Sequence, residues 1–137
     1  MKIIKLMLLL AVPIVIFQFW YTHQPKTGSE VTVSPNGFIP LPTIANADPR
    51  QVVVFAPENC PQEEARRSDD MARQLITRRI PSVRSHDVTF TSADPDPGTQ
   101  KRLDAVMNGE FPIVFVNGKG KANPTLDEVV AEYESTR

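Results

Sequence analysis

Hydrophobic positions divide the chain into an apolar start, a proline-rich tract and a region in which short apolar runs alternate with amphipathic segments. In this last region, Val52–Phe55 is a continuous apolar run, which is typical of a strand buried on both faces. After Pro61, which suits the first position of a helix, apolar residues recur at helical spacing and are predicted to form the inner face of that helix. They are Ala65, Ala72, Leu75, Ile76 and Ile80. Pro81 then disfavours further helix. The pattern predicts a buried strand followed by a long amphipathic helix.

The alternation continues to the end of the chain. Strands are predicted over 83–90 and 113–116, and helices over 99–108 and after Pro124. Asn117-Gly118 is a strong turn signal, so a short return strand is expected to begin just after it. The order is therefore βαβαβ, a weak further β, then α. Consecutive βαβ units predict an α/β domain with a right-handed crossover, a small mixed sheet and helices on both faces.

The start of the chain predicts a membrane anchor. The stretch from Ile3 to Tyr21 has 19 residues and is almost entirely apolar, close to the ~20 residues that cross hydrocarbon as a helix. Lys2 and Lys5 lie at its start and aromatic residues close it, which is typical of a segment that begins in the cytoplasm. Residues 1–21 are therefore interpreted as a single-pass signal anchor. By this topology we expect the bacterial inner membrane, with the folded domain in the periplasm.

A cleaved signal peptide is the alternative, and it would leave a protein secreted to the periplasm. Cleavage needs small residues soon after the apolar core. The segment Thr22–Lys26 fits this need poorly, and the small-residue motif Ala45-Asn46-Ala47 lies too far along the chain. Residues 22–50 hold five of the thirteen prolines and lack periodicity, apart from a candidate short strand at Val31–Val33. They are predicted to form an extended linker, and residues 51–137 the folded domain.

Composition removes several classes of function. A net charge of −1 gives no electrostatic case for a nucleic-acid partner. A single cysteine excludes an internal disulfide framework and a multi-cysteine zinc site. The two histidines, His23 and His86, are far apart in the sequence, and no nucleotide-binding or paired-carboxylate motif is present. Neither a metal nor a nucleic-acid partner is predicted.

The lone cysteine, Cys60, is placed between the predicted strand and the predicted long helix. Backbone N–H groups and the helix dipole stabilise a thiolate at such a position. The acidic residues Glu58, Glu63 and Glu64 oppose this effect by like-charge repulsion. The basic residues Arg66 and Arg67, one turn farther on, offset them in part. The balance stays open. A buried, inert thiol is the alternative, because free cysteines often behave as small apolar core residues.

The region from Gln51 to Tyr133 resembles the thioredoxin fold, and within that fold the glutaredoxins. Val52–Phe55 followed by Cys60-Pro61 is similar to the glutaredoxin opening, in which an apolar strand leads to a Cys-Pro-x-Cys site. Phe111-Pro112-Ile113 resembles the segment that holds the family's cis-proline opposite the active cysteine. The resemblance implies a thioredoxin-like three-layer domain in which Cys60 is the nucleophile and Pro112 is cis. It further implies that Pro61, Phe111 and Pro112 contact an extended peptide substrate.

The sequence departs from the glutaredoxin pattern at three places. Glu63 stands where the second cysteine would be, Pro57 replaces a lysine, and Gly120–Pro124 replaces the glycine-rich stretch that holds glutathione. Two of the usual glutathione contacts are thus missing, so no cofactor is predicted and glutathione is kept only as a candidate external thiol. A monothiol mechanism of thiol–disulfide exchange on exported proteins remains open to Cys60. The alternative is a non-catalytic adaptor that holds a partner in a cell-envelope assembly.

Overall fold

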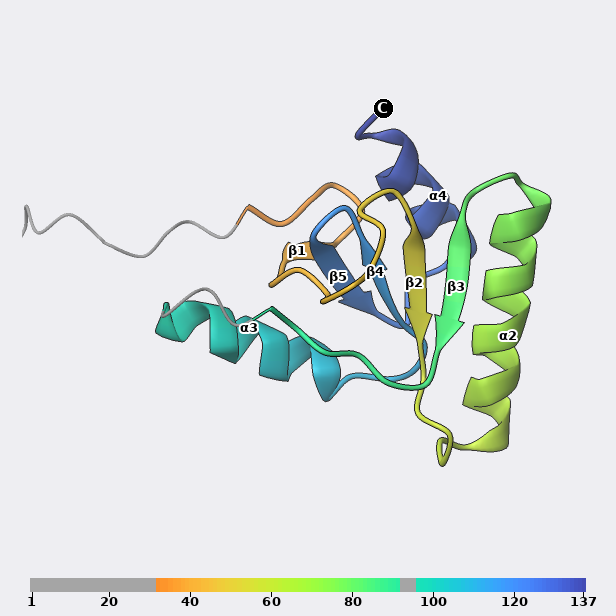
Figure 1. The fold of residues 1–137 in the computed structure, drawn as a ribbon, viewed down its shortest axis with the longest axis horizontal. Coiled ribbons are helices and arrows are strands. Elements are labelled where there is room, and N and C mark those ends of the chain that lie inside the picture. Colours follow the sequence, from red (N-terminus) through yellow and green to blue (C-terminus); the bar gives the residue numbers. More distant parts are fainter. Residues whose placement is uncertain (1–31, 92–95) are drawn as a thin grey trace, which may run out of the picture. The chain divides into compact units, whose positions relative to one another are not determined.

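A computed structural model describes residues 32–91 and 96–137. Its elements, in chain order (Figure 1), are β1 (Ile39–Pro40), β2 (Val52–Phe55), α2 (Gln62–Thr77), β3 (Ser82–Ser85), α3 (Pro97–Met107), β4 (Ile113–Val116), β5 (Lys119–Ala122) and α4 (Leu126–Glu134). The expected anchor at residues 1–21 lies outside the described residues. Within the described ranges, no helix combines the length and apolar character needed to cross a membrane.

The strands form one mixed sheet in the order β1-β5-β4-β2-β3. β2 and β3 are parallel and are joined through α2, whereas every other neighbouring pair is antiparallel. In the register of the sheet, Phe55 pairs with Ser85 on β3 and with Ile113 on β4. The end of β2 and the beginning of β4 therefore lie side by side. The prediction of an α/β domain with a small mixed sheet is confirmed.

Helices cover both faces of this sheet, as the element order predicted (Figure 1). Alternate side chains of a strand point to opposite faces, so Val52 and Val54 of β2 pack with Leu75 of α2 and Val129 of α4. On the other face, the neighbouring β-strand side chains pack with Val106 of α3; these strand residues are Val53, Phe55, Ile113 and Phe115. All four residues of β2 and all four of β4 are buried, which explains why both strands read as continuous apolar runs.

The tract before Gln51 corrects the predicted linker. Phe38 is fully buried in the core on the α2 and α4 face, and Ile39 pairs with Gly120 of β5. Leu41 and Ile44 pack against the opposite cluster. From residue 32 onward these residues belong to the folded domain, because a few apolar side chains among the prolines bury enough surface to hold the segment. Val33, expected in a short strand, is outside any strand and half exposed.

The second predicted strand is shorter than expected. β3 ends at Ser85, and farther along only an isolated bridge joins Phe90 to Ile44. The Ser85 hydroxyl donates to the carbonyl of Asp87, 2.5 Å away, which turns the chain from the sheet. The first and last residues of α3 lie within two positions of the predicted ones. α2 ends at Thr77, and Arg79 just beyond it has a φ of +61°, a left-handed conformation that is common after the end of a helix.

Candidate thiol site at the start of α2

Cys60 lies in the loop that joins β2 to α2. Its backbone N–H donates to the carbonyl of Pro57 at 3.2 Å, which closes a turn immediately before the helix. Pro61 is the N-cap, one position earlier than the first helical position predicted for it, and its carbonyl accepts the first helical bond from Ala65 N–H at 3.0 Å. The thiol is free and partly exposed. The expected placement of Cys60 between a strand and a helix is confirmed.

The start of α2 carries negative side chains. Glu63 and Glu64 occupy its first turn, and Pro61 supplies no side-chain cap. Carboxylates at this end of a helix are stabilised by its dipole. They therefore occupy the positive end of the helix, close in the sequence to Cys60.

The loop that contains Phe111 and Pro112 lies beside the end of β2. The Phe111–Pro112 peptide bond is cis, as the resemblance implied. The Phe111 ring packs edge-to-face on Phe55, the last residue of β2, with a centroid separation of 5.9 Å. Since Cys60 follows Phe55 by five residues, the same end of the sheet carries both the thiol loop and the proline loop. This juxtaposition follows from the pairing of Phe55 with Ile113.

Arg67, which was expected only to offset nearby negative charge, connects α2 to the proline loop. One guanidinium nitrogen of Arg67 donates to the carbonyl of Phe111 at 3.1 Å. Forty-four positions separate the two residues, and no sequence pattern links an exposed helical arginine to a distant carbonyl. Phe111 was expected to contact a peptide substrate, but its carbonyl already accepts a hydrogen bond from Arg67 within the domain.

Pro112 is less available than the resemblance implied. Its side chain is among the fully buried ones of the domain, and its carbonyl accepts from the N–H of Asn123 at 2.8 Å. Phe111 is partly exposed and Pro61 is exposed. Of the residues predicted to contact a substrate, Phe111 and Pro61 thus present surface, whereas Pro112 supports the loop from within.

Arg84 fixes the other side of the thiol loop. Its guanidinium donates to the carbonyl of Ala56 at 2.9 Å and to that of Ser85 at 2.7 Å, and it pairs with Asp69 at 3.0 Å. With only 15% of its side chain exposed, this arginine ties the ends of β2 and β3 to α2. An open hollow beside it is lined by Glu58, Asn59, Arg84, Ser85, His86 and Asp87.

Cys60 supplies a free thiol at this end of the sheet. His86, the histidine in the described ranges, is exposed beyond β3. No cluster of three His, Cys, Asp or Glu side chains suited to a metal ion occurs among residues 32–91 and 96–137. A lone thiol beside a helix start can form and release a mixed disulfide with an external partner. Comparison of the chain with protein-family models, curated proteins and solved structures finds no match.

Proposed function

We propose that this chain is a membrane-tethered, glutaredoxin-like monothiol protein that exchanges disulfides of exported proteins through Cys60. The observation that carries the proposal is the double contact of Phe111, whose ring packs on Phe55 and whose carbonyl accepts from Arg67. These contacts put the Phe111–Pro112 loop at the sheet end that also carries Cys60. The element order, with a parallel β2–α2–β3 unit, helices on both faces and a final α4, supports a thioredoxin-like three-layer fold.

The proposed chemistry consists of two balanced exchanges. The Cys60 thiolate attacks one sulfur of a disulfide in an exported protein, forming a mixed disulfide while the other substrate sulfur leaves as a thiolate. An external thiolate, from a small-molecule thiol such as glutathione or from a protein thiol, then attacks the substrate sulfur or the Cys60 sulfur. The mixed disulfide breaks and one thiolate leaves. Each step breaks one S–S bond and forms another, so no further oxidant is needed.

The experiment that tests the thiol role is the rate of Cys60 alkylation by iodoacetamide at pH 7 and pH 9. The same chain unfolded in urea is the matched control, and its rate should fall more than about tenfold between pH 9 and pH 7. A thiol activated at the helix start keeps most of its rate at pH 7. Wild-type protein should also form a mixed disulfide with a small-molecule disulfide, detected by mass, and Cys60→Ser should not. A folded thiol that reacts more slowly than the unfolded one and forms no mixed disulfide rejects the exchange role.

A non-catalytic adaptor is the second candidate, and a specific observation favours it. The carbonyls of Phe111 and Pro112 both accept internal hydrogen bonds, and the Pro112 side chain is buried. This surface then holds a partner through Pro61, the exposed part of Phe111 and the Cys60 loop without exchanging electrons. The adaptor is supported if Cys60→Ser complements a deletion strain as well as the wild type does.

The tether is tested separately from the thiol. A chain with an uncleaved anchor at residues 1–21 stays in the membrane fraction after carbonate washing and retains the mass of the complete sequence. A cleaved protein is found in the soluble periplasmic fraction with a smaller mass. Recovery in the cytoplasmic fraction overturns the export part of the proposal.

A further inference from the structure

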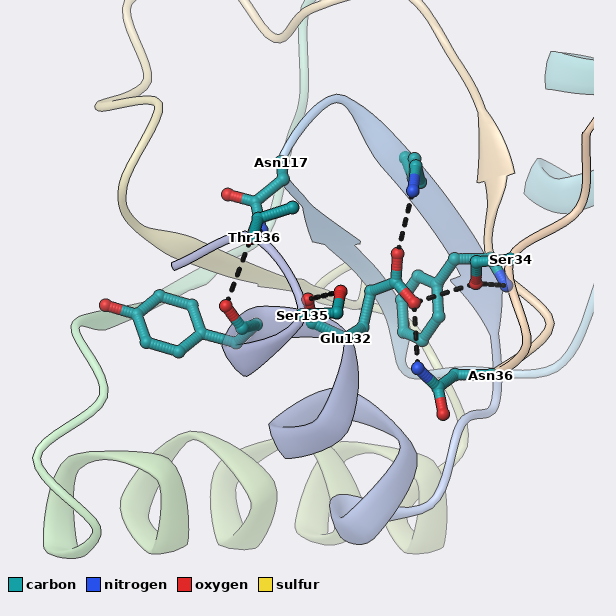
Figure 2. Close-up of polar contacts among 9 residues, drawn as sticks. Ser34, Asn36, Asn117, Glu132, Ser135 and Thr136 are labelled. Carbon is teal, nitrogen blue, oxygen red and sulfur yellow. Dashed lines mark hydrogen bonds and ion pairs between the residues drawn. The ribbon is translucent and has the colours of Figure 1, made fainter.

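The segment from Ser34 to Pro40 is folded onto the C-terminal part of the domain (Figure 2). It begins with a tight turn, in which Gly37 N–H donates to the Ser34 carbonyl at 2.9 Å and Gly37 has a φ of +82°. The Phe38 N–H donates to the Ser34 hydroxyl at 3.1 Å. The turn directs the Phe38 ring into the core, where it is fully buried.

A buried carboxylate joins this turn to α4 and β5. The Glu132 side chain is only 1% exposed. One of its oxygens accepts from the Ser34 hydroxyl at 2.7 Å and from the Asn36 amide at 3.0 Å, and Figure 2 shows both contacts. The other oxygen is paired with the Lys119 ammonium of β5 at 3.1 Å. A buried charge with this many donors is tightly held, because losing them would leave it uncompensated.

A second ion pair, made by a lysine two positions farther along β5, holds the same turn. The Lys121 ammonium donates to the Asn36 carbonyl at 3.0 Å and pairs with Glu128 of α4 at 2.8 Å. Glu128 is in turn fixed by the capping box of α4, since its carboxylate accepts from Thr125 N–H at 3.0 Å. The side-chain amide and the backbone carbonyl of Asn36 are thus both bound by charged groups, Glu132 of α4 and Lys121 of β5.

After the turn, the segment continues as a strand along β5. Ile39 pairs with Gly120 and Pro40 with Lys119, and Leu41 N–H donates to the Gly118 carbonyl at 3.0 Å. A Cβ built on Gly120 would lie 2.5 Å from Leu41 Cδ1, so the glycine permits the close approach. This pairing covers a β5 edge that would otherwise offer unpaired backbone groups.

We propose that residues 34–40 form a strap, locked over β5 and α4 by Glu132, that closes this edge of the sheet and shortens the tether to the membrane. The effect on the tether rests on the proposed anchor at residues 1–21. With the strap closed, the ten residues 22–31 remain between anchor and domain and reach about 35 Å at full extension. With the strap released, residues 22–40 would reach about 65 Å, because Leu41 and Ile44 stay packed in the domain.

Hydrogen exchange of the full chain in detergent micelles tests the lock. Glu132→Gln keeps the shape of the side chain but removes its charge, and we expect exchange of the peptide spanning residues 33–41 to rise on the order of tenfold. Glu134→Gln, an exposed position on the same helix, is the matched control and should leave exchange unchanged. Asn36→Ala removes fewer contacts and should raise exchange of the same peptide by a smaller factor.

Two outcomes overturn the strap. Unchanged exchange of residues 33–41 in Glu132→Gln would show that the carboxylate is no lock. An equal rise in peptides from β2 and β4 would show that the segment opens only with the whole core. The anchor is judged by a different readout, flotation of the same protein with phospholipid vesicles. A protein that keeps its strap protection but does not float refutes the anchor and leaves the lock intact.

Discussion

Single side chains join parts of this domain that are distant in the sequence. Arg67 on α2 and the Phe111 carbonyl are one such pair, and Glu132 with Ser34 is another, separated by 98 positions. Charged donors and acceptors of this kind stabilise by more than neutral ones when water is excluded. The exposed contact of Arg67 and the buried contact of Glu132 should therefore differ in their effect on stability.

Arg67→Ala is expected to lower the free energy of unfolding by about 0.5–1 kcal/mol, because an exposed hydrogen bond is partly replaced by water. Urea denaturation measures the change. Arg66→Ala, also exposed and next in the chain, is the matched control and should change stability by less than about 0.3 kcal/mol. If Arg67 also positions the proline loop, the Cys60 mixed disulfide forms several-fold more slowly in Arg67→Ala alone. Equal effects of the two substitutions would contradict this role.

Stability should depend on pH through Glu132. Burial raises the pKa of this carboxyl, but hydrogen bonds from Asn36, Ser34 and Lys119 outweigh burial and hold the pKa below its ordinary value. A lowered folded-state pKa means that the stabilisation is complete above the unfolded-state pKa, about 4.3, and is lost as the pH falls through the folded-state value. The hydrogen bond from Lys121 likewise lowers the pKa of Glu128, which lies one turn before Glu132 on α4.

Thermal unfolding between pH 7 and pH 3 measures this dependence. The wild type should lose stability as the pH falls below about 4.3. Glu132→Gln should be about 1–2 kcal/mol less stable at pH 7 and should lose less on acidification, because its amide does not titrate. The control Glu134→Gln should follow the wild-type curve. A Glu132→Gln curve parallel to the wild type over the whole range would rule out Glu132 as the titrating group.

At the scale of elements, the periodic pattern was most informative for α2 and for the two central strands. β2 and β4 are buried on both faces, so their apolar runs are continuous and the prediction was confirmed. The predicted inner face of α2 was right for Ala72 and Leu75 but wrong for Ile76, which is 60% exposed. The helix packs on the sheet through a narrower stripe than its apolar positions suggest.

Leu75→Ala is therefore expected to destabilise the domain by about 2.5–4 kcal/mol, because Leu75 is fully buried between the sheet and α4 and its removal leaves a cavity. Ile76→Ala is a matched control on the same helix and should cost less than about 1 kcal/mol. Chemical denaturation at pH 7 measures both. Similar costs for the two substitutions would contradict the observed facing of α2.

At the scale of the whole molecule, the strap decides where the domain ends and any tether begins. The described residues from 32 onward belong to one compact unit, although the proline content had placed the boundary near residue 51. With the proposed anchor at residues 1–21, inserting twenty Gly and Ser residues between residues 31 and 32 should lengthen the reach of the domain from the membrane without changing its unfolding. Energy transfer from a dye on Gln74→Cys, in a Cys60→Ser background, to acceptor-labelled lipid should fall after the insertion. Transfer that is unchanged would mean that residues 22–31 are not the tether.

The site is predictable from the sequence only in part. Cys60 at the junction of strand and helix follows from local pattern alone, because a strand, a turn and Pro61 succeed one another in the chain. The cis bond before Pro112 was implied by resemblance and is present. The burial of Pro112 and the donation from Arg67 could not be predicted, because both depend on which distant segments meet at one end of the sheet.

Local order along the chain determined the succession of strands and helices, the apolar character of the central strands and the position of the lone thiol. These depend on neighbouring residues, which the sequence lists directly. Only the tertiary structure decided that Phe38 belongs to the core and that Glu132 binds a turn 98 positions earlier. A short apolar segment among prolines carries no periodic signal, and a glutamate on a helix reads as a solvated residue. Their roles arise from long-range packing, in which β5 and α4 supply the partners that bury them.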